Sequence, residues 1–133
     1  MDNVSLKRLR EWFKKYAAAL PWRPVDLDAP RDPYAVWISE TMLQQTQVST
    51  VRDYFVKWMK RFPDIGTLAA ATEEEAFKYW QGLGYYSRAR NILKTAKTVA
   101  AAGREMPRTR KELEALPGIG AYTAGAILSL AYH

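Results

Sequence analysis

Glu40 is the residue whose type and spacing could do chemistry. It lies on a predicted helix that begins at Pro33, where proline is favoured at the first helical position. At 3.6 residues per turn, Gln44 and Gln47 fall on the same face as Glu40, and apolar residues on both faces are typical of a buried helix. Burial raises the pKa of a carboxyl group, which suits a general acid. The periodicity alone still favours a plainer interpretation, a surface glutamate paired with an arginine.

A second candidate is the sequence Leu-Pro-Gly-Ile-Gly at residues 116–120, between two predicted short helices. Glycines let backbone N–H groups converge, and the N-terminus of the following helix is positive, so such a turn can bind an anion without a cationic side chain. The phosphate-binding candidates are Pro117, Gly118, Ile119 and Gly120. The alternative is an ordinary glycine-containing turn between two helices.

A third candidate is the run Leu83, Gly84 and Tyr85, followed by Arg88 and Arg90. Such a loop could press an aromatic ring into a base stack while the arginines bind phosphates. The same pattern also fits a turn that connects two helices and buries a tyrosine, and the residue pattern alone favours that alternative.

Composition excludes several classes of function. The 133 residues carry a net charge of +6 and a pI near 9.6, which favours a polyanionic partner such as nucleic acid. Without cysteine there is no disulfide and no thiolate metal site, and the one histidine, His133, leaves no Ser–His or Cys–His mechanism. No apolar run approaches the roughly 20 residues of a membrane span, and no signal peptide is evident, so we expect a soluble intracellular protein.

The hydrophobic pattern predicts an all-α chain without strand-like alternation. A proline-containing ordered loop is expected at 21–32 and a turn at 63–66. Two of the helices begin with capping-box spacing, at Thr72 and Thr109. The predicted helices cover residues 4–20, a segment from 33 onward that is capped by Asp32, and about 49–61, 67–71, 72–80, 87–102, 109–116 and 121–133. We divide the chain into an N-terminal helix, 1–20, and a helical domain, 21–133.

Four motifs, in this order, resemble the MutY family of adenine DNA glycosylases within the helix-hairpin-helix glycosylase superfamily. The resemblance implies a helical barrel domain that includes the helix-hairpin-helix at 109–131, and removal of adenine mispaired with 8-oxoguanine or guanine in duplex DNA. The motifs are Pro21-Trp22-Arg23, Ser39-Glu40-x-Met42-Leu43-Gln44-Gln45-Thr46-Gln47-Val48, Trp80-x-Gly82-Leu83-Gly84-Tyr85-Tyr86-x-Arg88-x-Arg90-Asn91-Ile92 and Leu116-Pro117-Gly118-Ile119-Gly120-x-Tyr122-Thr123-Ala124-Gly125-Ala126.

The same resemblance implies roles for individual residues. Glu40 matches the acid that protonates N7 of the flipped adenine. Tyr122 matches a position near the reacting sugar, where bifunctional relatives carry a lysine nucleophile. Trp22 and Arg23 match the adenine pocket. The implied DNA contacts, with Gln45 and Tyr85 as wedges at the lesion, are Gln44, Gln45, Leu83, Gly84, Tyr85, Arg88, Arg90, Pro117, Gly118, Ile119 and Gly120.

The sequence departs from the family after its final helix. In the family, a second carboxylate stabilises the cationic sugar and four cysteines hold a 4Fe–4S cluster. Here no Asp or Glu follows Glu114, so we expect a chain truncated before the iron–sulfur module, with no metal or cofactor of its own and weak or no activity alone. The cluster is expected in the full-length family member.

The expected partner is double-stranded DNA with an adenine mispair, and a separate chain that carries the C-terminal half is a further candidate. The resemblance implies a nucleoid location in the cytoplasm for a bacterial protein, or a nuclear or mitochondrial one for a eukaryotic protein. Three alternatives stay open: a non-catalytic DNA-binding fragment, one half of a two-chain enzyme, and a thymine-mismatch glycosylase.

Overall fold

The structure, a computed structural model, describes residues 31–44, 46–103 and 105–132, and these residues form seven helices and no strand. The all-α prediction is confirmed for this part of the chain, whereas the predicted helix at 4–20 lies outside it. None of the described helices combines the length and apolar character needed to cross a membrane. The helices are α2 (Pro33–Leu43), α3 (Val48–Arg61), α4 (Ile65–Ala69), α5 (Glu73–Trp80), α6 (Tyr86–Ala101), α7 (Arg110–Glu114) and α8 (Ala121–Leu130).

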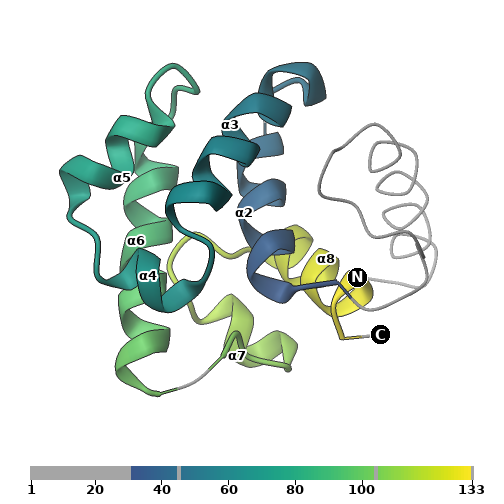
Figure 1. Ribbon diagram of the computed structural model, residues 1–133. Coiled ribbons are helices and arrows are strands. Elements are labelled where there is room, and N and C mark those ends of the chain that lie inside the picture. The colour runs from purple at the N-terminus through teal and green to yellow at the C-terminus, as the bar shows by residue number, and fades with distance from the viewer. Residues whose placement is uncertain (1–30, 45, 104, 133) are drawn as a thin grey trace.

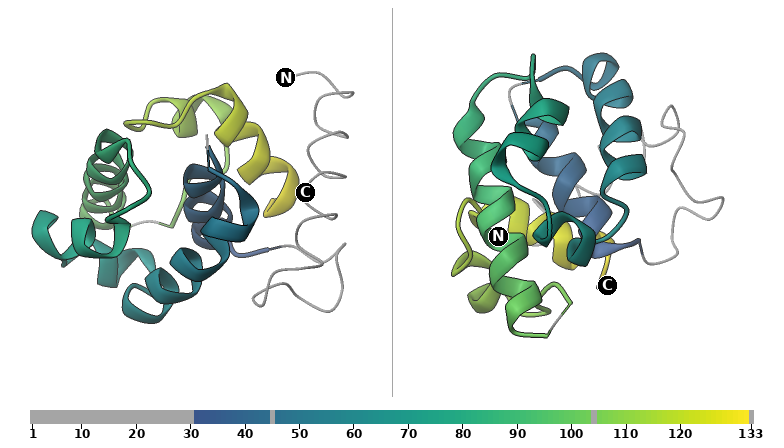
Figure 2. Two further views of the ribbon diagram at one scale, coloured as in Figure 1. Left: turned by 90° about the horizontal axis from the view of Figure 1, so that it is seen from above. Right: turned by 60° about the vertical axis from the view of Figure 1, so that its left-hand side comes forward.

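Helix α2 lies in the middle of the domain, between α3 and α8, and α6 packs against α4 and α5 (Figures 1 and 2). Three fully buried tryptophans, Trp37, Trp58 and Trp80, fill the centre. The rings of Trp58 and Trp80 meet edge to face, with their centroids 5.9 Å apart, an arrangement that aromatic pairs prefer. Helix α2 is therefore enclosed on both sides, as its apolar sequence predicts.

The start of α2 agrees with the sequence, but its end does not. Asp32 accepts a hydrogen bond of 3.1 Å from the backbone N–H of Tyr34, and Pro33 begins the helix. The helix ends at Leu43, and Gln44 has an extended backbone with ψ of 114°. The expectation that Gln47 shares a helical face with Glu40 is therefore wrong. Gln47 is the N-cap residue of α3.

Side-chain caps set the other boundaries. Asp64 accepts a 2.7 Å hydrogen bond from the backbone N–H of Thr67, so α4 begins at Ile65. The turn predicted at 63–66 is thus confirmed for Pro63 and Asp64 but wrong for Ile65 and Gly66. Thr72 and Thr109 cap α5 and α7, which confirms both predicted starts.

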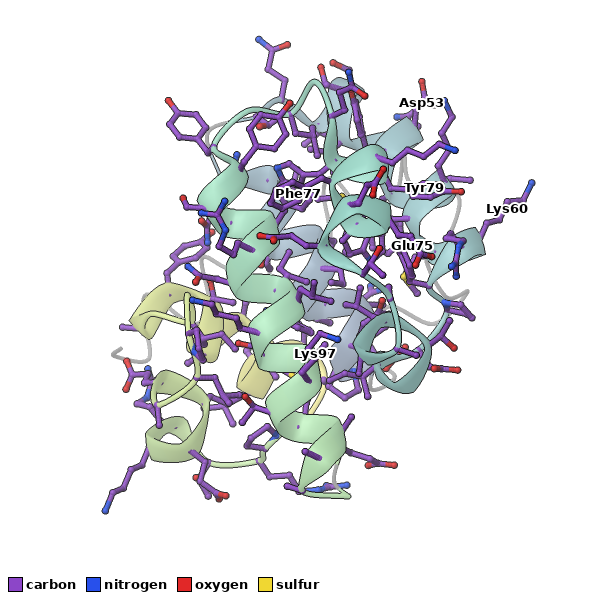
Figure 3. The ribbon with its side chains drawn as sticks, turned by 90° about the vertical axis from the view of Figure 1, so that its left-hand side faces the viewer. Asp53, Lys60, Glu75, Phe77, Tyr79 and Lys97 are labelled. Atoms are coloured by element: carbon purple, nitrogen blue, oxygen red, sulfur yellow. The ribbon has the colours of Figure 1, made fainter. Side chains whose placement is uncertain are left out.

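Helix α6 also caps a neighbour with one of its cations. Lys97 extends from α6 toward α4 (Figure 3), and its Nζ donates to the carbonyl oxygens of Ala69 and Ala71 at 2.7 and 3.3 Å. Carbonyl groups at the end of a helix lack intrahelical partners, so this lysine completes the C-terminus of α4.

Candidate functional site

Glu40 is a buried carboxyl group on the central helix. Its side chain is 2 % exposed, and its Oε1 has no hydrogen-bond partner among the described residues. Burial raises its pKa from 4.5 to about 7, because an apolar environment disfavours the charged form. The surface ion pair that periodicity favoured is therefore wrong. A carboxyl group in this state can hold a proton at neutral pH and give it to a bound molecule.

Helix α8 brings two side chains to the Glu40 site. Gln44, just past the end of α2, donates from its Nε2 to the hydroxyl of Thr123 at 3.2 Å. Tyr122 is half-exposed, and its pKa is raised by burial and further by the negative charge of Glu40. The structure thus brings Glu40, Gln44 and Tyr122 together, although 82 positions separate Glu40 from Tyr122 in the sequence (122 minus 40).

The loop between α5 and α6 presents one aromatic ring to solvent. Tyr85 is 62 % exposed and has a φ of 52°, a left-handed conformation that residues other than glycine rarely adopt. Trp80 donates from Nε1 to the carbonyl oxygen of Gly84 at 2.9 Å, and this hydrogen bond holds the loop against the buried Trp80 side chain. The predicted alternative of a buried tyrosine is wrong for Tyr85, whereas Leu83 is buried and presents no side chain to a partner.

The two arginines after this loop behave differently. Arg88 turns inward, and its Nη1 donates to the backbone carbonyls of Thr41 and Gln44. Arg90 stays at the surface, where its Nε lies 2.8 Å from a carboxylate oxygen of Glu73. Exposed ion pairs contribute little to stability, so Arg90 can exchange this partner for a phosphate. The structure thus gives Arg88 two contacts within the protein that the sequence did not predict.

The hairpin between α7 and α8 is held against α6. Gly118 has a φ of 78°, and a Cβ at this position would lie 2.9 Å from Cβ of Asn91. Thr95 donates to the carbonyl oxygen of Pro117 at 3.0 Å. The side chain of Ile119 is buried, so the hairpin can offer a ligand its backbone and the first N–H groups of α8, whose N-cap residue, Gly120, has no side-chain cap.

Sequence reasoning missed Tyr54 and Thr123. Tyr54 on α3 donates a 2.6 Å hydrogen bond to the carbonyl oxygen of Gln81, at the base of the Tyr85 loop, and a Cβ on Gly82 would lie 2.2 Å from its Oη. Thr123 is buried and holds Gln44. Its place beside Tyr122 was a usable signal, whereas the contact of Tyr54 crosses between two helices and left no local pattern.

Some predicted residues cannot be placed. Trp22, Arg23 and Gln45 lie outside the described residues. The whole sequence has no cysteine and so offers no thiolate ligand for an iron–sulfur cluster. Within the described residues, no group of three or more His, Asp or Glu side chains is arranged to hold a metal ion.

Comparisons with known proteins show which family this chain resembles. The profile of the "HhH-GPD superfamily base excision DNA repair protein" family matches residues 38–127. The chain is 48% identical to the adenine DNA glycosylase of Mus musculus over 93% of its own length and 25% of that protein. It is 44% identical to the adenine DNA glycosylase of Buchnera aphidicola subsp. Baizongia pistaciae over 98% of its own length and 36% of that protein. The chain thus spans about a quarter to a third of the curated relatives it matches.

Two solved structures superpose on this fold. A thermostable thymine-DNA glycosylase superposes with a TM-score of 0.72 at 26% identity, covering 98% of this chain and 60% of that one. A non-covalent endonuclease III–DNA complex superposes with a TM-score of 0.70 at 26% identity, covering 96% of this chain and 60% of the other. Both likenesses extend over almost all of this chain.

Proposed function

Because the chain belongs to the HhH-GPD superfamily of base excision DNA repair proteins, we propose that it binds duplex DNA and excises adenine mispaired with 8-oxoguanine or guanine. The adenine preference is supported by 44–48% identity to adenine DNA glycosylases, compared with 26% to the thymine-DNA glycosylase structure. DNA as the partner is further supported by the likeness to an endonuclease III–DNA complex. These relatives are longer than this chain, so their activity is carried over as a proposal.

The observation that carries the proposal is the burial of the Glu40 carboxyl group, whose Oε1 has no hydrogen-bond partner among the described residues. A pKa near 7 leaves a substantial fraction of this carboxyl protonated at neutral pH. When its proton passes to a ring nitrogen of the flipped adenine, the N-glycosidic electron pair leaves with the base and the positive charge stays on the sugar. Water then adds to the sugar carbon and loses a proton. The half-exposed Tyr122 lies beside Glu40 and is available to contact the sugar.

The side chain of Tyr122 also distinguishes hydrolysis from DNA strand cleavage by a lyase reaction. A phenol cannot form a Schiff base with the sugar, whereas a lysine amine can. We therefore propose hydrolysis without lyase chemistry. Borohydride added during turnover should trap no covalent complex between this chain and DNA.

The test compares the chain with its Glu40→Gln variant on a duplex that carries one adenine opposite 8-oxoguanine. Adenine release is followed under single-turnover conditions by alkaline cleavage at the abasic site, and duplex affinity by fluorescence anisotropy. Because weak activity is expected of this chain alone, release is followed over long time courses. We expect the variant to lose at least about a hundredfold relative to the wild-type rate, within the usual contribution of general acid catalysis, while it retains duplex affinity.

Three other outcomes would each change the assignment. Equal release by both proteins would exclude Glu40 as the acid. Tight binding with no release by either would favour the non-catalytic DNA-binding alternative. Release of thymine from a T:G duplex in preference to adenine would favour the thymine-mismatch alternative.

A further inference from the structure

Arg88 provides a helix cap for a neighbouring helix. It lies in the first turn of α6, where a positive charge opposes the helix dipole. Its Nη1 donates to the carbonyl oxygen of Thr41 at 2.7 Å and to that of Gln44. These carbonyls lie at the C-terminal end of α2, a helix with no basic residue in its own last turn. Since terminal carbonyls lack intrahelical partners, Arg88 gives α2 the cap that its own sequence lacks.

The same guanidinium group holds the exposed Tyr85 loop. Its carbon lies 5.1 Å from the ring centroid of Tyr85 and 5.5 Å from that of Trp80, within cation–π range. The left-handed backbone of Tyr85 is unfavourable on its own and persists only where its surroundings hold it. One side chain thus joins the end of the Glu40 helix to the loop that presents Tyr85.

The guanidinium group is also enclosed. Its Nε and Nη2 atoms are shielded from solvent, without a hydrogen-bond partner among the described residues. Arg88 also lines a cavity of about 20 Å³ together with Asn91, Pro117 and Gly118, among others. Arg88 therefore lies next to three segments with predicted DNA contacts. These are the end of α2 at Gln44, the loop with Tyr85, and the α7–α8 hairpin.

We propose that Arg88 is a positioning residue that fixes Gln44 and Tyr85 relative to each other for binding a mispaired duplex, and that it does not bind a phosphate. This inference rests on the proposed function, because it assumes that both segments meet the mispair. Segments that are already ordered lose less conformational entropy on binding. An enzyme without this connection should keep its general affinity for DNA but lose its preference for the lesion.

The test uses Arg88→Met, which removes the charge and retains much of the length, and Arg88→Lys as the conservative variant. Affinity is measured at several salt concentrations for a duplex with adenine opposite 8-oxoguanine and for the same duplex with adenine opposite thymine. We expect Arg88→Met to lose about tenfold in the ratio of these affinities, equivalent to about 1.4 kcal/mol. Its affinity for the A:T duplex and its salt dependence should stay unchanged, and Arg88→Lys should restore part of the ratio.

Lys97→Met is the matched control. Lys97 is another cation of α6 that caps a neighbouring helix, α4, so its loss should lower stability and leave the affinity ratio unchanged. A phosphate contact by Arg88 would instead weaken both duplexes and reduce the salt slope by about 0.9. That result, or an unchanged ratio in Arg88→Met, would overturn the inference. A wild-type chain without preference for the mispair would overturn the proposed function, and the inference with it.

A measurement on the wild-type chain covers the case in which Arg88→Met fails to fold. With ¹⁵N-arginine labelling, the Nε–H signal of Arg88 should remain protected from solvent exchange and keep its chemical shift when the mispaired duplex is added. A large shift of this signal, comparable to that of a surface arginine that binds DNA, would contradict a positioning role.

Discussion

At the scale of single residues, Glu40 combines a high cost of burial with a clear chemical use. A buried carboxylate without a hydrogen-bonding partner is unfavourable, so this side chain makes the folded protein less stable at neutral pH than an uncharged residue would. The group that lowers the stability is the same carboxyl group that the proposed reaction needs in its protonated form. Destabilising groups of this kind are typical of active sites, where stability and activity are in conflict.

Glu40→Gln should stabilise the protein in a pH-dependent way. The pKa of Glu40 is about 7 in the folded state, compared with 4.5 for an unperturbed glutamate, so the folded wild type loses stability as pH rises from 4.5 through 7. The gain from glutamine should be near zero at pH 4 and reach about 3 kcal/mol at pH 8, at 1.36 kcal/mol per pKa unit. Chemical denaturation at the two pH values measures the difference.

The control for this prediction is Glu74→Gln. Glu74 is exposed on α5, so the same chemical change there should alter the unfolding free energy by less than about 0.5 kcal/mol at either pH. A stability gain in Glu40→Gln that is equal at pH 4 and pH 8 would show that burial of the charge is not its cause.

At the scale of secondary-structure elements, local signals predicted most of the fold. Asp32, Thr72 and Thr109 each cap a helix where their spacing indicates, because an N-cap needs only a side-chain oxygen and the first turn of the same helix. The early end of α2 was missed because Arg88, 44 positions later in the sequence than Gln44 (88 minus 44), helps to end it. A contact between distant helices leaves no periodic pattern.

In the candidate site, too, local features could be predicted from the sequence, whereas contacts between distant helices could not. The burial of Glu40 was suggested by apolar residues on both sides of α2, but only the packing of α3 and α8 decides it. The protein contacts of Arg88 were not predicted, because a basic residue after a loop is equally compatible with a phosphate and with a buried carbonyl. Tyr54 carries no local signal for its hydrogen bond to Gln81.

Gly118→Ala should disrupt the α7–α8 hairpin. A Cβ there would lie 2.9 Å from Cβ of Asn91, on a backbone with a φ of 78°, so alanine introduces both a clash and strain. We expect a loss of roughly 1–3 kcal/mol in unfolding free energy and weaker binding of any duplex, whatever its sequence. Thermal unfolding and anisotropy measure the two effects.

Gly120→Ala is the matched control in the same hairpin. No atom lies within 4 Å of a Cβ built at Gly120, and its φ of −92° is open to any residue. Stability should therefore stay close to wild type. An equal loss of stability in both variants would mean that the clash with Asn91 is not its cause.

At the scale of the whole molecule, some of the 20 Lys and Arg side chains are occupied by contacts within the protein. On α6, Arg88 and Lys97 donate to backbone carbonyls. These two residues hold helices together while they add to the positive field that attracts a polyanion. Exposed cations near the hairpin, such as Lys111, are better placed for direct phosphate contact.

This difference predicts how single lysines affect the salt dependence of binding. Each phosphate contact contributes about 0.9 to the slope of log affinity against log salt. Lys111→Ala should reduce the slope for an undamaged duplex by about that amount, because Lys111 is exposed in α7, directly before the hairpin. Lys97→Ala removes the same charge from a side chain already bound to α4, so its slope should match the wild type. Anisotropy titrations at four or five salt concentrations separate the two variants, and a wild-type affinity that does not change with salt would exclude phosphate binding as the main source of affinity.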